Sequence, residues 1–107
     1  MSATLYIAGP MRGRPQFNFP AFAEAAARLR AAGYGVVSPH ELHSGRLDLP
    51  WGEYMRRDLT LLCSGAIGGM ALLDGWSNSQ GATLEVAVGN AIGMPKGLVD
   101  WWLGGGR

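Results

Sequence analysis

The chain has 107 residues, of which 16% are charged, and its formal net charge is +1. This length fits one domain around one core, and the balanced charge gives no sign of the basic surface that binds duplex DNA or anionic membranes. The single cysteine, Cys63, excludes an internal disulfide, and no apolar run reaches the ~18 residues of a membrane span. We therefore predict a cytoplasmic globular protein with one domain over residues 1–107.

The first third of the chain alternates strand and helix patterns. Residues 4–8 form a short apolar run bounded by a Gly-Pro pair, which predicts a strand. Asn18 is a typical N-cap for a helix that begins at Phe19 and stops at Gly33. Residues 34–38 then predict a second strand.

The alternation continues to the C-terminus. Residues 41–50 predict a loop, and residues 51–63 predict a helix with an apolar stripe. Residues 66–73 are nearly all apolar, as in a parallel strand that is covered on both faces. Residues 79–92 predict a helix, and residues 96–102 predict a last strand.

Strands that alternate with helices predict an α/β fold. We expect a flavodoxin-like or Rossmann-like three-layer sandwich whose parallel sheet has four or five strands. In such sheets, ligands bind beyond the carboxyl ends of the strands. This rule selects residues 9–13, 38–43 and 74–81, which are rich in polar residues and glycine.

The segment DGWSNSQGATLE, residues 74–85, leads from the third strand into a helix. Ser79 is a helix-capping residue type, Gly81 lets the backbone approach a ligand, and a helix N-terminus favours anions. The helical neighbours of Glu85 are small, which leaves room for a ligand in front of its carboxylate: Gly81, Ala82, Val88 and Gly89. The alternative is that Glu85 only stabilises the helix dipole.

Asp58 and Arg12 are further charged candidates. Asp58 lies beside the apolar stripe of its helix, where an unpaired acid is costly, so it forms either a structural ion pair or a second carboxylate of the site. Two converging carboxylates suit glycosidic chemistry. Arg12, between Gly9 and Gly13, predicts either a side chain that grips an anion or a solvated loop arginine.

The histidines give a weaker signal. His40 and His43 are three residues apart, but even with Cys63 they are too few for a zinc site, so we predict neither a metal nor a cofactor. Trp51 and Trp76 flank the predicted crevice and are candidates to stack on a base.

Four motifs together resemble a known family. They are LYIAGPMRG, NFPAF, WGEYMRRDL and LLDGWSNSQGATLEVAVGNAIG, spread over about residues 4–95. In this order and spacing they are similar to the nucleoside 2-deoxyribosyltransferase-like superfamily, and most similar to its small, often phage-borne members. The resemblance implies an enzyme that acts on the N-glycosidic bond of a deoxynucleoside or deoxynucleotide.

The resemblance also implies a role for each matching residue. Glu85 matches the glutamate that attacks C1′, Tyr6 the tyrosine that orients it, and Asp58 the aspartate that handles the proton of the leaving base. Ser79 matches the serine of the 5′-monophosphate N-glycosidase branch, and Arg12 matches its phosphate-gripping arginine. The expected substrate-binding residues are Gly9, Arg12, Gly13, Trp51, Trp76, Ser79 and Gly81.

We therefore expect hydrolysis of a 2-deoxynucleoside 5′-monophosphate. The alternatives are a nucleoside 2-deoxyribosyltransferase and a non-catalytic nucleotide-binding module. The expected partner is a small deoxynucleotide or deoxynucleoside, and neither a nucleic acid nor a membrane. The resemblance further implies a homodimer or a higher homo-oligomer.

Overall fold

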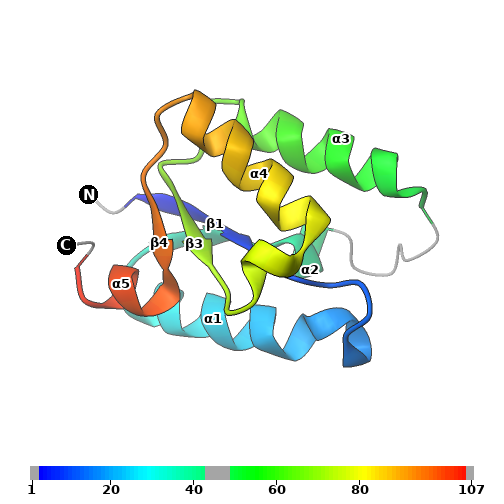
Figure 1. Cartoon of the computed structure of the whole chain (residues 1–107). Helices are drawn as coiled ribbons and strands as arrows, with labels where there is room; N and C mark the ends of the chain where they lie inside the picture. Colours follow the sequence, from blue (N-terminus) through cyan, green and yellow to red (C-terminus); the bar gives the residue numbers. More distant parts are fainter. Residues whose placement is uncertain (1–2, 43–48, 106–107) are drawn as a thin grey trace.

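The computed structural model describes residues 3–42 and 49–105, and a four-stranded parallel sheet forms its centre (Figure 1). The strands are β1 (Thr4–Ala8), β2 (Gly35–Val37), β3 (Gly69–Leu72) and β4 (Lys96–Leu98). Their order is β2-β1-β3-β4, which is a flavodoxin-like arrangement and confirms the predicted fold class. β1 and β3 are central, and Ala8 pairs with Leu72 where both strands end.

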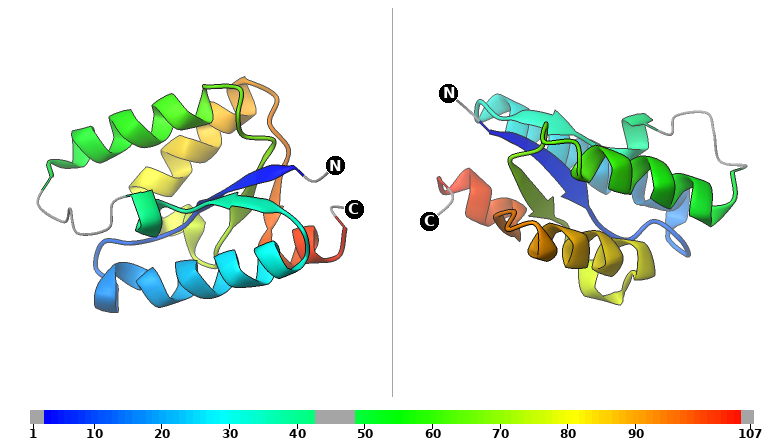
Figure 2. Two further views of the ribbon diagram at one scale, coloured as in Figure 1. Left: turned by 180° about the vertical axis from the view of Figure 1, so that it is seen from behind. Right: turned by 90° about the horizontal axis from the view of Figure 1, so that it is seen from above.

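Helices cover both faces of this sheet. The helices are α1 (Phe19–Ala31), α2 (Pro39–Leu42), α3 (Trp51–Leu62), α4 (Gln80–Ala91) and α5 (Val99–Leu103), with 3₁₀ turns η1 (Pro15–Asn18) and η2 (Trp76–Asn78). α1 and α5 lie on one face, and α3 and α4 lie on the other (Figures 1 and 2). No helix in the described part of the chain has the length and apolar character that crossing a bilayer requires.

The two faces of β1 divide the core. Leu5 and Ile7 pack toward α1 and α5, whereas Tyr6 and Ala8 pack toward α3 and α4. Side chains of a strand point alternately to opposite faces, so this division follows from the sequence. All four residues are fully buried. The alternation thus places the only polar side chain of the four, the Tyr6 phenol, under α3 and α4.

The last predicted strand, residues 96–102, is wrong in its second half. β4 ends at Leu98, and Val99–Leu103 form α5. Trp101 folds back against Gly97, where any Cβ atom would collide with its indole ring. The Trp102 indole donates a hydrogen bond of 2.7 Å to the Met70 carbonyl oxygen, so both tryptophans pack on the sheet and do not extend it.

Two local predictions before α3 also need correction. The loop predicted at 41–50 begins with the end of α2, because the Ser38 carbonyl accepts hydrogen bonds from the Glu41 and Leu42 N–H groups; residues 43–48 lie outside the described residues. Asn18 does precede α1, but its φ is 62°, and no capping bond from its side chain to α1 is found in the described structure. Its amide binds the Pro10 carbonyl instead.

Candidate active site

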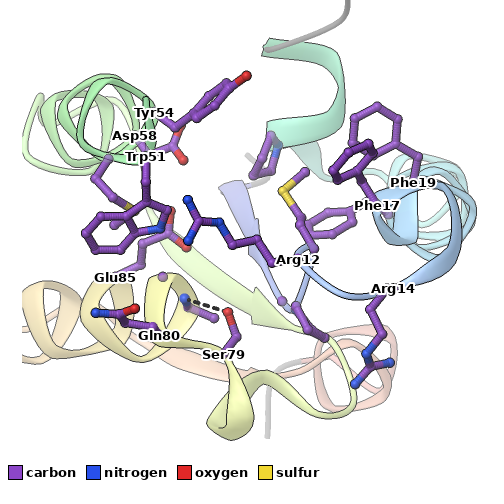
Figure 3. A pocket seen from close by; sticks show the side chains of 18 of the residues that line it. Arg12, Arg14, Phe17, Phe19, Trp51, Tyr54, Asp58, Ser79, Gln80 and Glu85 are labelled. Atoms are coloured by element: carbon purple, nitrogen blue, oxygen red, sulfur yellow. Dashed lines mark hydrogen bonds between the residues drawn. The ribbon is translucent and has the colours of Figure 1, made fainter. Parts of the chain in front are cut away.

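A cavity of about 470 Å³ opens at the carboxyl end of the sheet (Figure 3). Its walls come from the loop after β1, the first two turns of α3 and the start of α4. This volume lies within the ~300–1,000 Å³ typical of small-molecule sites. The cavity therefore lies where the general rule for parallel α/β sheets places a ligand.

Three ionisable side chains from three elements meet at the floor of the cavity. The Tyr6 hydroxyl, from β1, donates a hydrogen bond of 2.6 Å to Glu85 Oε2, from α4. Asp58, from α3, lines the same cavity as Glu85. Tyr6 is fully buried, and Asp58 and Glu85 are each only 5% exposed. Burial of two carboxyl groups so close together lowers the stability of the fold.

The protonation of this group is strongly perturbed. Burial raises the pKa of Glu85 from 4.5 to about 8, the Tyr6 hydrogen bond opposes the rise, and the charge and hydrogen bonding of Asp58 add to it. The pKa of Tyr6 is raised well above its ordinary value of 10, mainly by burial and further by the charges and hydrogen bonding of Glu85 and Asp58. Tyr6 therefore stays a hydrogen-bond donor at neutral pH, and the raised pKa of Glu85 keeps its carboxyl group largely protonated there.

A cation lies at the entrance of the cavity. The loop after β1 carries Arg12, whose guanidinium carbon lies 6.0 Å from the centroid of the Trp51 ring. Figure 3 shows Arg12 reaching into the cavity toward Trp51, whereas Arg14 points away from it. Arg14 lies against Gly75, where a Cβ atom would be 2.8 Å from Arg14 Nη2. The mouth of the cavity thus offers a guanidinium group to an anion.

The first turn of α4 forms the wall beside this cation. Ser79 is the N-cap residue, and its Oγ accepts a hydrogen bond of 3.2 Å from the Ala82 N–H (Figure 3). That contact leaves the hydroxyl proton of Ser79 to donate to a ligand. The N–H groups of Gln80 and Gly81 belong to the first turn, where a helix has no intrahelical acceptors. This turn is therefore suited to bind negative charge.

A second wall of the cavity is apolar. Its members are Met11, Phe17, Phe19, Phe22 and Pro39. The rings of Phe17 and Phe19 are 6.2 Å apart, and Phe17 remains 43% exposed. Neither this wall nor Tyr54 was predicted from the sequence, although Tyr54 precedes Asp58 by one helical turn and could have been found by that spacing.

The structure brings most of the predicted site residues together. Those that line the cavity are Gly9, Arg12, Trp51, Asp58, Ser79, Gly81 and Glu85, with Tyr6 bonded to Glu85 beneath them. Two others lie apart. Gly13 is an exposed turn residue with φ 75°, and Trp76 packs against the core between the sheet and α3 and α4.

Gly9 has a structural role in addition to its place in the lining. A Cβ atom at this position would stand 2.7 Å from the Leu73 Cβ atom, inside any allowed contact. The residue is therefore glycine because the loop after β1 runs directly against the end of β3. This close approach brings the loop after β1 next to the segment that follows β3, and both segments lead to residues that line the cavity.

The histidines do not contribute a metal centre within residues 3–42 and 49–105, where no three potential ligands gather. His40 Nδ1 is hydrogen-bonded to the buried Ser38 Oγ, and its ring lies beside Phe19 and Phe22. His43 lies outside the described residues. Cys63 is exposed just after α3, away from the cavity residues.

Fold and site together define a small α/β protein with a ligand-sized cavity at the carboxyl edge of a parallel sheet and a buried carboxyl pair at its floor. A family model described as a domain of unknown function (DUF4406) matches residues 3–96, and the chain belongs to this family. The matched span contains Tyr6, Asp58 and Glu85. A comparison with curated proteins gave no significant match.

Proposed function

We propose that this protein hydrolyses the N-glycosidic bond of a 2-deoxynucleoside 5′-monophosphate, with Glu85 as the nucleophile. The observation that carries the proposal is the buried Tyr6–Glu85 hydrogen bond beside Asp58, beneath a cavity with a cation at its mouth. The motif resemblance to the nucleoside 2-deoxyribosyltransferase-like superfamily supports the same assignment. The arrangement also suits glycosidic chemistry on general grounds, because it pairs two carboxyl groups in one cavity.

In the first step, Glu85 forms a bond to C1′ while the bond from C1′ to the base breaks. Tyr6 holds Oε2, so Oε1 makes the attack. The base leaves with a proton from Asp58, so the reacting form carries a protonated Asp58 and an ionised Glu85. In the second step, Asp58 removes a proton from water, the hydroxide attacks C1′, and Glu85 is released.

The 5′-phosphate would bind at the mouth of the cavity. Arg12 and the first turn of α4 approach this place from the two central strands, and Ser79 supplies a hydroxyl. Hydrogen bonds to charged groups contribute ~1.5–3 kcal/mol each, so this cluster would favour a phosphorylated substrate.

The base would lie on the α3 side, within reach of Asp58. Trp51, Tyr54 and Asp58 are spaced three and four residues apart, so they share one face of α3, and all three line the cavity. An aromatic ring beside the proton donor provides a surface on which a base can stack.

The test is to incubate the protein with a panel of deoxynucleosides and their 5′-monophosphates and to measure the released base. We expect release from the monophosphates without an acceptor base. Glu85→Ala should remove most of this activity, whereas Glu24→Ala, on the exposed side of α1, should retain it. Release that depends on an acceptor base would instead establish a transferase, and ligand binding without release would establish a binding module.

A second measurement separates the phosphate site from the rest. Arg12→Ala should lower kcat/KM for the monophosphate roughly tenfold to a hundredfold, at ~1.4 kcal/mol for each factor of ten, and should leave an unphosphorylated nucleoside nearly unaffected. Ser79→Ala should act in the same direction. Equal losses for both substrates would contradict the phosphate assignment. The homo-oligomer implied by the resemblance stays a prediction.

A further inference from the structure

The loop from Pro10 to Asn18 carries much of the cavity surface. Its lining residues are Pro10, Met11, Arg12, Arg14 and Phe17. One short segment therefore presents both the cation at the mouth and part of the apolar wall. Whatever fixes the shape of this loop also fixes where these groups lie.

The end of this loop has a costly backbone conformation. Gln16, Phe17 and Asn18 have φ values of 54°, 54° and 62°, in the left-handed region. For residues other than glycine, this region costs roughly 1–2 kcal/mol each, and only asparagine and aspartate enter it with ease. Three such residues in a row persist only where surrounding contacts hold them, and such segments concentrate at functional sites.

The contacts that hold the loop are hydrogen bonds across it. The Asn18 amide, through Nδ2, donates to the Pro10 carbonyl oxygen at 2.9 Å and so ties the last residue of the loop to the first. Inside it, the Arg14 N–H donates to the Met11 carbonyl at 3.3 Å, and the Phe17 N–H donates to the Arg14 carbonyl at 3.0 Å. The Asn18 side chain thus closes the loop through its hydrogen bond to Pro10.

We infer that Asn18 is a positioning residue, which closes the loop from Pro10 to Asn18 and thereby holds Arg12 over Trp51 at the mouth of the cavity. An asparagine before a helix ordinarily caps it, but here the amide serves the loop instead. The inference deepens the proposed function, because it rests on Arg12 as the phosphate-binding group.

Two variants at Asn18 distinguish the effect of the side-chain amide from the effect of the left-handed backbone conformation. Asn18→Asp keeps the size and the tolerance of a left-handed backbone, but it replaces the donor by an acceptor that repels the Pro10 carbonyl. Asn18→Gly favours the same backbone and removes the side chain without adding charge. Asn90→Asp, on the exposed side of α4, is the matched control for the added charge.

The first readout needs no substrate. In NMR spectra of the full chain, the ring of Trp51 should shift the Arg12 side-chain signals, and Trp51→Leu defines the size of that shift. We expect both Asn18 variants to lose most of it and Asn90→Asp to retain it, with backbone spectra that confirm folding. An unchanged shift in either folded Asn18 variant would overturn the inference, whatever reaction the protein catalyses.

The second readout is kinetic. Both Asn18 variants should raise KM for the monophosphate about tenfold with kcat nearly retained, and Asn18→Gly should cost nothing further in an Arg12→Ala background. A full additional loss in that background would overturn the inference. A lost NMR shift with unchanged KM would support the positioning role and would count against phosphate binding by Arg12, so the two proposals fail separately.

Discussion

Replacing the proposed nucleophile should stabilise the protein at alkaline pH. The folded-state pKa of Glu85 is about 8, whereas its ordinary value is 4.5. Below pH ~4.5 the carboxyl group is protonated in both the folded and the unfolded states, and stability is unaffected. As the pH rises from ~4.5 to ~8, the carboxyl group is ionised in the unfolded chain but keeps its proton in the folded protein, so the free energy of unfolding falls across this window and levels off above it. Glu85→Gln removes the ionisation and keeps an acceptor for Tyr6.

The magnitude follows from the pKa difference. A difference of about 3.5, at ~1.36 kcal/mol for each unit, corresponds to at most about 5 kcal/mol. Water in the cavity screens part of this cost, so we expect the variant to gain ~2–5 kcal/mol on the wild type between pH 4.5 and pH 9. For a domain of this size, that is a rise in Tm of about 10 °C or more.

The assay is urea unfolding of wild type and Glu85→Gln at pH values from 4.5 to 9. Glu24→Gln, on the exposed side of α1, is the control and should follow the wild type at every pH. A difference between wild type and Glu85→Gln that stays constant with pH would refute the reasoning, because a buried carboxyl group with a raised pKa must produce a pH-dependent difference. A gain at pH 4.5 that disappears at pH 9 would refute it equally.

Further predictions concern Glu85, its neighbours Tyr6 and Asp58, and the loop after β1. In the wild type, kcat/KM should rise as the pH increases through ~8, where Glu85 ionises and becomes a nucleophile; Tyr6→Phe should move this limb to higher pH, because Tyr6 lowers the pKa of Glu85. In Asp58→Asn, the pKa of Glu85 should fall and move this limb to lower pH, and the rate should be ~10²–10⁴ lower; an unchanged rate and profile would exclude Asp58 from proton transfer. Gly9→Ala should lower stability by ~1–3 kcal/mol in urea unfolding, because its methyl group meets Leu73, and an unchanged midpoint would show that the loop moves freely.

Much of the site followed from local patterns that tertiary structure left intact. Alternation along residues 4–8 places Tyr6 on the opposite face from Leu5 and Ile7, and the small neighbours of Glu85 indicated space before its carboxyl group. The order of strands and helices then brings these residues to one edge of the sheet. The meeting of Arg12, Ser79 and Glu85 at one cavity could be predicted because it depends on topology alone, whereas Tyr6 entered only through the motif resemblance.

The predictions that failed depend on specific side-chain contacts that no periodic pattern shows. Trp101 and Trp102 favour a strand by type, but Gly97 and Gly69 leave space on the sheet that their rings occupy. Asn18 suits a helix cap and a left-handed turn equally well, and only the position of the Pro10 carbonyl decides between them. The cavity residue Phe17 depends on that same turn, so no periodic pattern reveals it.

The bond between Tyr6 and Glu85 joins residues 79 positions apart. β1 also pairs with β3, in a register that places Leu5 opposite Gly69. The central strand β1 therefore lacks one of its two neighbours until most of the chain has been synthesised. A ribosome that synthesises the protein from its N-terminus therefore releases an apolar strand long before the partner that buries it. The carboxyl pair can assemble only after α4 has emerged, so a growing chain that still lacks α4 cannot carry out the proposed reaction.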